Sequence, residues 1–209
     1  MRHPAAMLRR HTQPRLFGRR VMLRPISTHD FSAWREVRLR NEDWLVPWEP
    51  IRSPILPDPT RDRSAFEARC AARERERAAD HAYPFGVFVD QRLAGEININ
   101  NVTRGAMRGA TIGYWIDRAM AGHSYTSEAV VVIAKYAFEQ LELHRLEICI
   151  VPRNTNSRRV VEKLALRSEG VAERYLEING VWEDHVRYAI TVEEWNARAD
   201  ELTTAWISG

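Results

Sequence analysis

The sequence predicts an α/β protein built on one mixed, mostly antiparallel central sheet of about seven strands, with helices on both faces. Three observations predict it: strand-length apolar segments come in groups, segments of helical periodicity separate these groups, and the chain has no internal repeat. The 209 residues suffice for one core, and no composition break divides them. We therefore expect one domain over residues 16–209, preceded by a basic, disordered segment at 1–15.

The first half of the chain is expected to form one strand, two helices and a three-stranded meander. The boundaries come from N-cap residues, from prolines that end a strand or prevent a helix, and from the spacing of apolar residues. We place the strand over 19–25, the first helix over 27–45, a Pro-rich loop over 46–59, the second helix from a cap at Asp58 or Thr60 to Ala79, and the meander strands over 83–89, 93–102 and 110–116, the first two joined at Asp90-Gln91.

In the second half, helices and strands alternate before a final hairpin. Asn179-Gly180 between two alternating segments is the typical sequence of a tight hairpin turn. We place helices over 124–141 and 154–166, a strand over 144–151 between them, hairpin strands over 174–178 and 182–190, and a last helix from about Thr191.

The composition is that of a soluble, cytoplasmic protein. The chain is 44% hydrophobic and 28% charged, its apolar runs are too short to span a bilayer, and its N-terminus lacks a secretory signal. Cys70 and Cys149 stand far apart without a paired histidine spacing, so we expect neither a disulfide nor a metal site. The net charge of +3 is spread along the chain, apart from an Arg-rich N-terminus, and does not predict DNA binding.

A strand-to-helix junction at residues 113–129 gives the first functional signal. A strand ends near Ile116, a loop with Gly122 follows, and a helix begins at about Ser124. The start of such a helix presents unpaired backbone N–H groups and a partial positive charge, which favour a phosphate group. An ordinary capped loop is the alternative interpretation. The Rossmann and Walker A glycine patterns are missing from the sequence, which disfavours those nucleotide-binding modes.

A second junction of this kind spans residues 151–166. Asn154 or Asn156 is placed to cap the helix, Ser157 adds a hydroxyl group, and Arg158 and Arg159 add two guanidinium groups near the helix start. Taken alone, this stretch indicates simple capping with surface arginines. Its combination with the first junction is what makes it informative.

Together, the two junctions resemble the acetyl-CoA-binding core of the GNAT acetyltransferase superfamily. The resemblance covers about residues 16–195 and implies the GNAT fold with acetyl-CoA as cofactor. It implies that main-chain N–H groups of the loop hold the pyrophosphate, that the preceding strand pairs with the pantetheine arm, and that the second helix start lies beside the sulfur atom. The cofactor-binding residues that it implies are Trp115, Ile116, Asp117, Met120, Ala121, Gly122, His123, Ser124, Tyr125, Thr126, Asn154, Ser157 and Arg158.

Two further stretches, residues 94–105 and 175–186, resemble the RimJ type of this superfamily, the ribosomal-protein-alanine acetyltransferases. This resemblance implies direct transfer, in a ternary complex, from acetyl-CoA to the N-terminal α-amine of an alanine in a ribosomal protein, on or off the ribosome. A small amine, such as a polyamine or an aminoglycoside, is the alternative acceptor. A ribosome- or RNA-associated factor is the alternative class. No membrane partner is expected, and both a monomer and a dimer fit the sequence.

The chain departs from the family pattern at four places. The pattern (Gln or Arg)-x-x-Gly-x-(Gly or Ala) is replaced by Ala119 at its first place and by Ser124 at its last. Ala165-Leu166 stands where the later helix usually ends in Gly-Phe, and Val161 stands where many relatives carry a proton-donating tyrosine. These departures leave the general acid open.

Two residues are candidates for catalysis. Glu96 lies in the central meander among isoleucines, where burial would raise its pKa and suit it to act as a base; an outward-facing surface glutamate is the alternative. The resemblance places the Ser157 hydroxyl near the departing sulfur. The backbone N–H near Ile116 or Asp117 is the candidate to polarise the thioester carbonyl.

Five residues are candidates for acceptor binding. The resemblance places Asn101, Arg104, Tyr114 and Asp184 along the groove opposite the cofactor. Glu49, on the Pro-rich loop beside Trp48, is the candidate to hold a cationic N-terminus. Each of these residues also fits an ordinary role in a turn or in packing.

Overall fold

The computed structural model describes residues 14–208, in which eight strands form one sheet in the order β1-β2-β3-β4-β5-β6-β8-β7. All neighbouring strands are antiparallel except β5 and β6, which are parallel. The predicted mixed, mostly antiparallel sheet is therefore confirmed, with one strand more than expected. The strands are β1 Leu16–Phe17, β2 Val21–Arg24, β3 Tyr83–Val89, β4 Arg92–Thr103, β5 Gly109–Ile116, β6 Arg145–Ile150, β7 Arg167–Ile178 and β8 Val181–Thr191.

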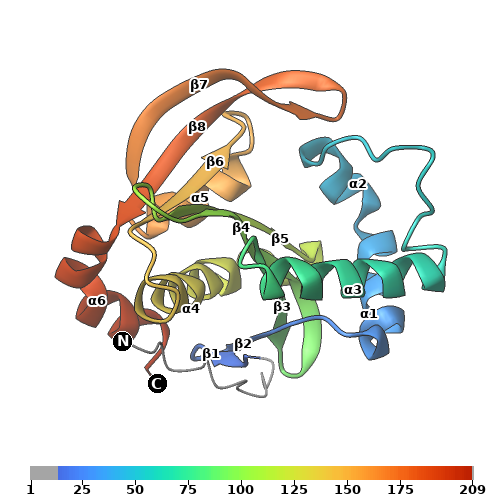
Figure 1. The fold of residues 1–209 in the computed structure, drawn as a ribbon, viewed down its shortest axis with the longest axis horizontal. Helices are drawn as coiled ribbons and strands as arrows, with labels where there is room; N and C mark the ends of the chain where they lie inside the picture. Colours follow the sequence, from blue (N-terminus) through green and yellow to red (C-terminus); the bar gives the residue numbers. More distant parts are fainter. Residues whose placement is uncertain (1–13, 209) are drawn as a thin grey trace, which may run out of the picture.

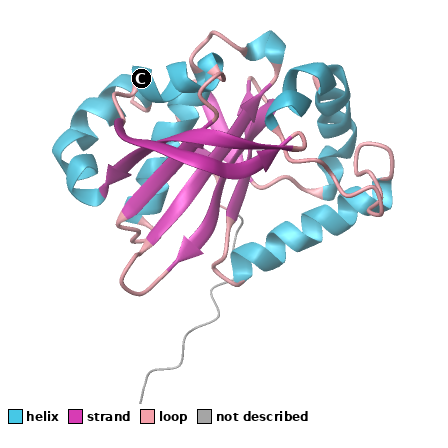
Figure 2. Ribbon diagram, turned by 90° about the horizontal axis from the view of Figure 1, so that it is seen from above, coloured by secondary structure: helices cyan, strands magenta, loops and turns pink. Residues whose placement is uncertain are grey.

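Helices cover both faces of the sheet (Figures 1 and 2). Helices α4 and α6 pack against each other, and α4 also contacts β2, β4 and β5, whereas α1 and α3 contact β4 and β3. The six helices are α1 Phe31–Arg40, α2 Glu42–Leu45, α3 Arg63–Ala78, α4 Tyr125–Glu139, α5 Thr155–Lys163 and α6 Val192–Trp206, with single 3₁₀ turns at Thr28–Asp30, Val46–Trp48 and Arg118–Met120.

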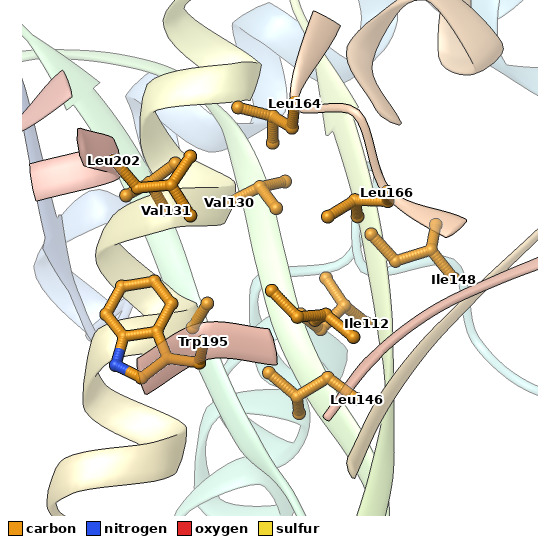
Figure 3. Close-up of a pocket in the computed structure, with 11 residues that line it drawn as sticks. Ile112, Val130, Val131, Leu146, Ile148, Leu164, Leu166, Trp195 and Leu202 are labelled. Carbon is orange, nitrogen blue, oxygen red and sulfur yellow. The ribbon is translucent and has the colours of Figure 1, made fainter. Parts of the chain in front are cut away.

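The core lies around α4, which is buried over most of its circumference. A helix that is buried on all sides has apolar residues on all its faces, which is why residues 129–134 form a continuous apolar run. A cavity of about 20 Å³ lies where α4 and α6 meet β5, β6 and β8, and Figure 3 shows the side chains that line it. Only apolar side chains line it, among them Val131, Leu146 and Trp195, so it is a packing gap rather than a ligand site.

The structure corrects several predicted boundaries. The first predicted helix is broken at Asn41, whose buried amide donates to the Val37 carbonyl and to the Asp117 carboxylate instead of pointing to solvent. Asp62, and not Asp58 or Thr60, caps α3, because its carboxylate accepts from the N–H groups of Ser64 and Ala65. Strand β7 begins seven residues earlier than predicted, and β1 was missed. Residues 1–15 were expected to be disordered, and residues 1–13 of this segment lie outside the described residues.

Both predicted tight turns are confirmed. Asp90 and Gln91 have φ values of 46° and 65°, and Asn179 and Gly180 have φ values of 47° and 82°. Positive φ at both central residues is the type I′ geometry that matches the twist of a hairpin. Gly95 meets a different requirement: a Cβ there would collide with the Trp115 carbonyl oxygen, so glycine allows β4 and β5 to approach.

Candidate active site

The site is created where the parallel strands β5 and β6 separate. They pair only from Gly109 to Thr111 and from Arg145 to Glu147, and beyond Thr111 the edge of β5 that faces β6 has no strand partner. A cavity of about 520 Å³ opens there, which is within the usual range for a small-molecule site. Its walls come from β5, from the junctions before α4 and α5, and from the 44–49 segment.

One end of the cavity is shaped to hold an anion. Gly122 and Ser124 adopt positive φ values of 84° and 66°, which turn the chain into the start of α4. Ser124 makes no side-chain cap to this helix, whereas α3, α5 and α6 each begin with one. The first N–H groups of α4 therefore remain available to a ligand at the positive end of the helix dipole.

Two basic residues of α5 face the same end. Lys163 donates from Nζ to Ser124 Oγ at 2.6 Å, and both Lys163 and Arg159 line the cavity. Neither forms an ion pair with a described residue. A helix start combined with two free cations matches the phosphates of coenzyme A in charge and in donor chemistry. The residues present therefore fit the cofactor.

The free edge of β5 forms the next part of the wall. The Asp117 N–H donates to the Ala94 carbonyl at 2.7 Å, so strand alternation directs the N–H of Ile116 away from β4 and toward the open edge. The Ile116 carbonyl accepts from Trp44 Nε1 at 3.1 Å. The Ile116 N–H is therefore unused by β4 and faces the open edge, whereas the Asp117 N–H is already used by the Ala94 carbonyl.

Asp117 also does not line the cavity, contrary to expectation. The residue is 1% exposed, and its carboxylate accepts from Arg40, from Asn41 and from the N–H of Ala119. Burial would raise the pKa of Asp117, but the hydrogen bonds from Arg40 and Asn41 outweigh it and lower that pKa. This carboxylate holds α1 to the loop after β5 rather than contacting cofactor.

The start of α5 presents Ser157 to the cavity. Asn154 Oδ1 caps the helix by accepting from the Ser157 N–H at 3.1 Å, and the Ser157 carbonyl accepts from the Tyr114 hydroxyl at 3.0 Å. Both hydroxyl groups therefore lie on the cavity wall. Burial raises the pKa of Tyr114, which keeps its phenol protonated at neutral pH. Val161, in contrast, is fully buried and apolar, so no proton donor stands at that position.

Arg158 and His123 lie outside the cavity, although both were expected to bind the cofactor. Arg158 turns toward Tyr188 and Glu162. His123 contributes its carbonyl oxygen, which accepts from Arg20 at 3.1 Å.

Arg20 connects the loop before α4, residues 117–124, here called the phosphate loop, to the beginning of the described chain. Besides the His123 carbonyl, its guanidinium contacts the buried Glu128 carboxylate at 3.0 Å and lies 4.9 Å from the centre of the Tyr125 ring. Glu128 also accepts from the N–H of Val21 at 2.9 Å. The loop that faces the anion-binding end is therefore held by β2 and α4 together.

Glu96 lies on the face of the sheet covered by α1 and α3, outside the cavity. The residue is 3% exposed, and its carboxylate accepts from Trp34 Nε1 at 2.6 Å and from Arg69 at 2.6 Å. Burial would raise the pKa of Glu96, but the charge of Arg69 and the hydrogen bond from Trp34 outweigh it, so the pKa is lowered. The expected raised pKa is wrong, and the geometry gives this residue a structural role.

The expected acceptor residues divide into two groups. Glu49 and Tyr114 line the cavity, and Glu49 is held by a bidentate pair with Arg38 at 2.6 and 2.7 Å. The other three expected acceptor residues lie outside it: Asn101 donates to Thr111 and Arg104 pairs with Asp80, both at the closed end of the β4–β5 hairpin, while Asp184 accepts from the Arg174 N–H within the β7–β8 hairpin.

The sequence analysis missed part of the cavity wall. The missed residues are Leu45, Ser127, Asn156, Arg159, Val160, Glu162 and Lys163. The spacing of Asn156, Arg159, Val160 and Lys163 is that of one helix face, so helical periodicity applied to this junction would have found them. Among residues 14–208, no cluster of His, Cys, Asp or Glu forms a metal site, and no helix has the length and apolarity to cross a membrane.

Comparison with known proteins identifies the family. The model of the acetyltransferase (GNAT) domain matches residues 20–167. The chain belongs to the GNAT acetyltransferases. As in other members, acetyl-CoA is the cofactor, and the chain is an N-acetyltransferase that is similar to RimJ.

Individual relatives agree with this assignment. A Bacillus subtilis protein named Probable N-acetyltransferase YjcK is 35% identical over 84% of this chain and 96% of its own length. The [ribosomal protein uS5]-alanine N-acetyltransferase of Escherichia coli is 31% identical over 87% of this chain and 92% of its own. The structure of Mycobacterium smegmatis RimJ in complex with CoA-disulfide is 33% identical, with a TM-score of 0.83 over 92% of this chain and 93% of that one.

Proposed function

We propose that this enzyme acetylates the N-terminal α-amine of a ribosomal protein that begins with alanine, an acceptor of the kind named for its Escherichia coli relative. The observation that carries the proposal is the continuity of the cavity. It runs from the phosphate-binding end to the wall formed by Trp44, Trp48 and Glu49, so that cofactor and acceptor are able to meet in one space. Neither cysteine lines this cavity, which favours direct transfer over a covalent acetyl-enzyme.

An α-amine suits the groups that line this cavity. The thioester of acetyl-CoA supplies the acetyl group, and the attacking amine must be neutral. An α-amine with a pKa of about 7.7–8.0 is roughly a tenth neutral at pH 7, whereas a lysine is below about 0.1% neutral. The acceptor therefore needs little help from a base. Glu49, at the acceptor wall, is the candidate to orient the amine, with its charge shared with Arg38, and strong burial of a base is unnecessary.

The hydroxyl groups of Ser157 and Tyr114 complete the proposed site. Both line the cavity next to the free edge of β5, and Ser157 Oγ forms no hydrogen bond with another described residue. The serine hydroxyl is therefore available to protonate the departing thiolate. The Ile116 N–H, directed to the same edge, is available to polarise the carbonyl oxygen.

Mass spectrometry tests this proposal. We expect an acetyl-CoA-dependent gain of one acetyl group on an alanine-starting peptide from the uS5 N-terminus, and no gain on the same peptide with a blocked N-terminus. Polyamines and an aminoglycoside serve as competing acceptors. Acetylation of a small amine in place of the peptide would contradict the proposed acceptor and leave the enzyme class unchanged.

A further inference from the structure

A second cavity, of about 280 Å³, lies between α3 and the sheet. Its walls come from α3, from the segment after β2 and from the beginning of β3, the strand on which α3 packs (Figure 1). It shares no lining residue with the cofactor cavity. Its volume is close to the lower end, about 300 Å³, of the usual range for small-molecule sites. The α3 cavity, as we call it, is therefore large enough for a ligand of its own.

Three arginines of α3 form one wall of the α3 cavity. Arg69, Arg73 and Arg77 are spaced four residues apart, so they share one face of the helix, and all three line the cavity. Like charges at this spacing destabilise a helix, so the row requires counter-charges. Within residues 14–208, only Arg69 has a carboxylate at hydrogen-bond distance, that of Glu96 at 2.6 Å.

The other two guanidinium groups lack a counter-charge. Arg73 forms no hydrogen bond with a described residue, and the Glu76 carboxylate, at 3.8 Å, is too far away for one. Arg77 donates to the Pro84 carbonyl at 2.6 Å, but its buried Nε has no partner among the described residues. Burial lowers the pKa of both arginines, because nearby carboxylates do not compensate for the lost water. Two partly buried positive charges thus stand beside an open cavity.

Three carboxylates also line the α3 cavity, and none of them supplies the missing charge. Glu96 is already paired with Arg69. Glu67 and Glu74 are exposed, so water screens their charges, and Glu67 contacts Arg63 at 3.0 Å. No described residue therefore supplies the anion that the two guanidinium groups lack.

We propose that the α3 cavity is a second ligand site, which binds a small organic phosphate monoester through Arg73 and Arg77. At neutral pH such a group carries a charge of about −1.5 to −2, and its oxygens accept paired hydrogen bonds from guanidinium groups. A monocarboxylate would neutralise only one of the two charges. Pro25, Ile26 and Phe85 also line the cavity and offer an apolar surface to the organic part of the ligand.

Isothermal titration with phenyl phosphate tests this site. The enzyme is first saturated with coenzyme A, so that the probe cannot enter the phosphate-binding end of the cofactor cavity. We expect one phenyl phosphate to bind per chain, more tightly than inorganic phosphate, and phenol not to bind. Arg73→Gln removes a guanidinium that has no hydrogen bond to lose, so the fold should be kept, and the affinity for phenyl phosphate should fall at least about tenfold.

Two variants serve as controls, both measured at saturating coenzyme A. Arg75→Gln makes the same change at an exposed residue of α3 outside the cavity, and Lys163→Gln removes a cation of the cofactor cavity. Both should bind phenyl phosphate as the unaltered enzyme does.

Four outcomes would overturn the proposal. They are no binding to the saturated enzyme, unchanged affinity in Arg73→Gln, equal losses in Arg73→Gln and Arg75→Gln, and a loss in Lys163→Gln alone, which would place the probe in the cofactor cavity. Equal affinity for inorganic and phenyl phosphate would reject an organic ligand. None of these results depends on which amine the enzyme acetylates, so the proposed function is tested separately.

Discussion

Two polar clusters on opposite sides of the sheet differ in how far neighbouring residues satisfy their hydrogen bonds and charges. The carboxylate of Glu96, under α1 and α3, is buried and uses both oxygens, one for Trp34 and one for Arg69. Across the sheet, Arg159, Lys163 and the first N–H groups of α4 lie around a cavity of about 520 Å³ with few partners of their own. Residue type alone makes the glutamate the more attractive catalytic candidate.

The difference shows how structural and functional polar groups are separated. A buried charge whose partners satisfy it completely contributes to the fold, because moving it to another task leaves its partner unpaired. A polar group that lines a cavity without a partner is available to a ligand. Three predictions test whether this distinction holds for the two clusters.

The largest expected effect is on stability at Glu96. Glu96→Gln leaves the half-buried guanidinium of Arg69 without its counter-charge, and we expect a loss of about 3 kcal/mol in the free energy of unfolding. Urea denaturation measures it, and the affinity for coenzyme A should not change. Glu74→Gln, on the exposed side of α3, is the control and should stay within about 0.5 kcal/mol.

The pH dependence of the same variant gives a second reading. Because the pKa of Glu96 is lowered from its ordinary value of 4.5, its stabilisation is complete above pH 4.5 and disappears as the pH falls through the lower folded value. The variant should lack this acid-induced loss. A variant of normal stability with a shifted pH–rate profile would instead make Glu96 the catalytic base.

An intermediate effect is expected at Ser157. Ser157→Ala keeps the backbone bonds to Asn154 and Tyr114 and removes only the hydroxyl group. If that hydroxyl protonates the thiolate, kcat should fall by at least about 10²-fold with little change in the affinity for coenzyme A. Steady-state kinetics measures both quantities, with Ser168→Ala on β7 as the control. An unchanged kcat would assign the proton to Tyr114 or to solvent.

The smallest expected effect is on cofactor binding at Lys163. Lys163→Gln removes a cation that contacts Ser124 at the start of α4, and we expect coenzyme A to bind about tenfold more weakly. Isothermal titration measures it. Arg158→Gln, five residues earlier on the same helix but outside the cavity, is the matched control. If both variants lost the same affinity for coenzyme A, the effect would come from the overall surface charge and not from a contact of Lys163 with the cofactor.

The fold was predictable where local chemistry decides the structure. The turn sequences Asn179-Gly180 and Asp90-Gln91 correctly predicted two hairpins, whose tight turns have positive φ at both central residues. The two strand-to-helix junctions correctly predicted where the cofactor cavity lies. The break between α1 and α2 was not predictable, because it depends on a contact between Asn41 and Asp117, 76 residues apart.

The sequence predicted the parts of the site that are formed by residues close together in the chain, but not the parts that depend on contacts between distant segments. The alternation of β4 shows that Glu96 and Ile97 point to opposite faces, but not which face an arginine-bearing helix covers. The sequence therefore could not distinguish a base from half of an ion pair. The prediction for Asn101 and Arg104 was wrong for a simpler reason: both residues lie at the end of β4 that is farthest from Ile116.

The contact of Arg20 with both Glu128 and the His123 carbonyl makes the phosphate loop and the N-terminal strands a single mechanical unit. Linkage is reciprocal, so a ligand that fixes the loop also fixes the chain that leads into β2. Coenzyme A should then protect the peptide bonds after Arg15 and Arg19 from trypsin, although both arginines precede the cofactor loop by about a hundred residues. By the same linkage, a protein domain fused directly before Leu16 should change the affinity for coenzyme A through its nucleotide end.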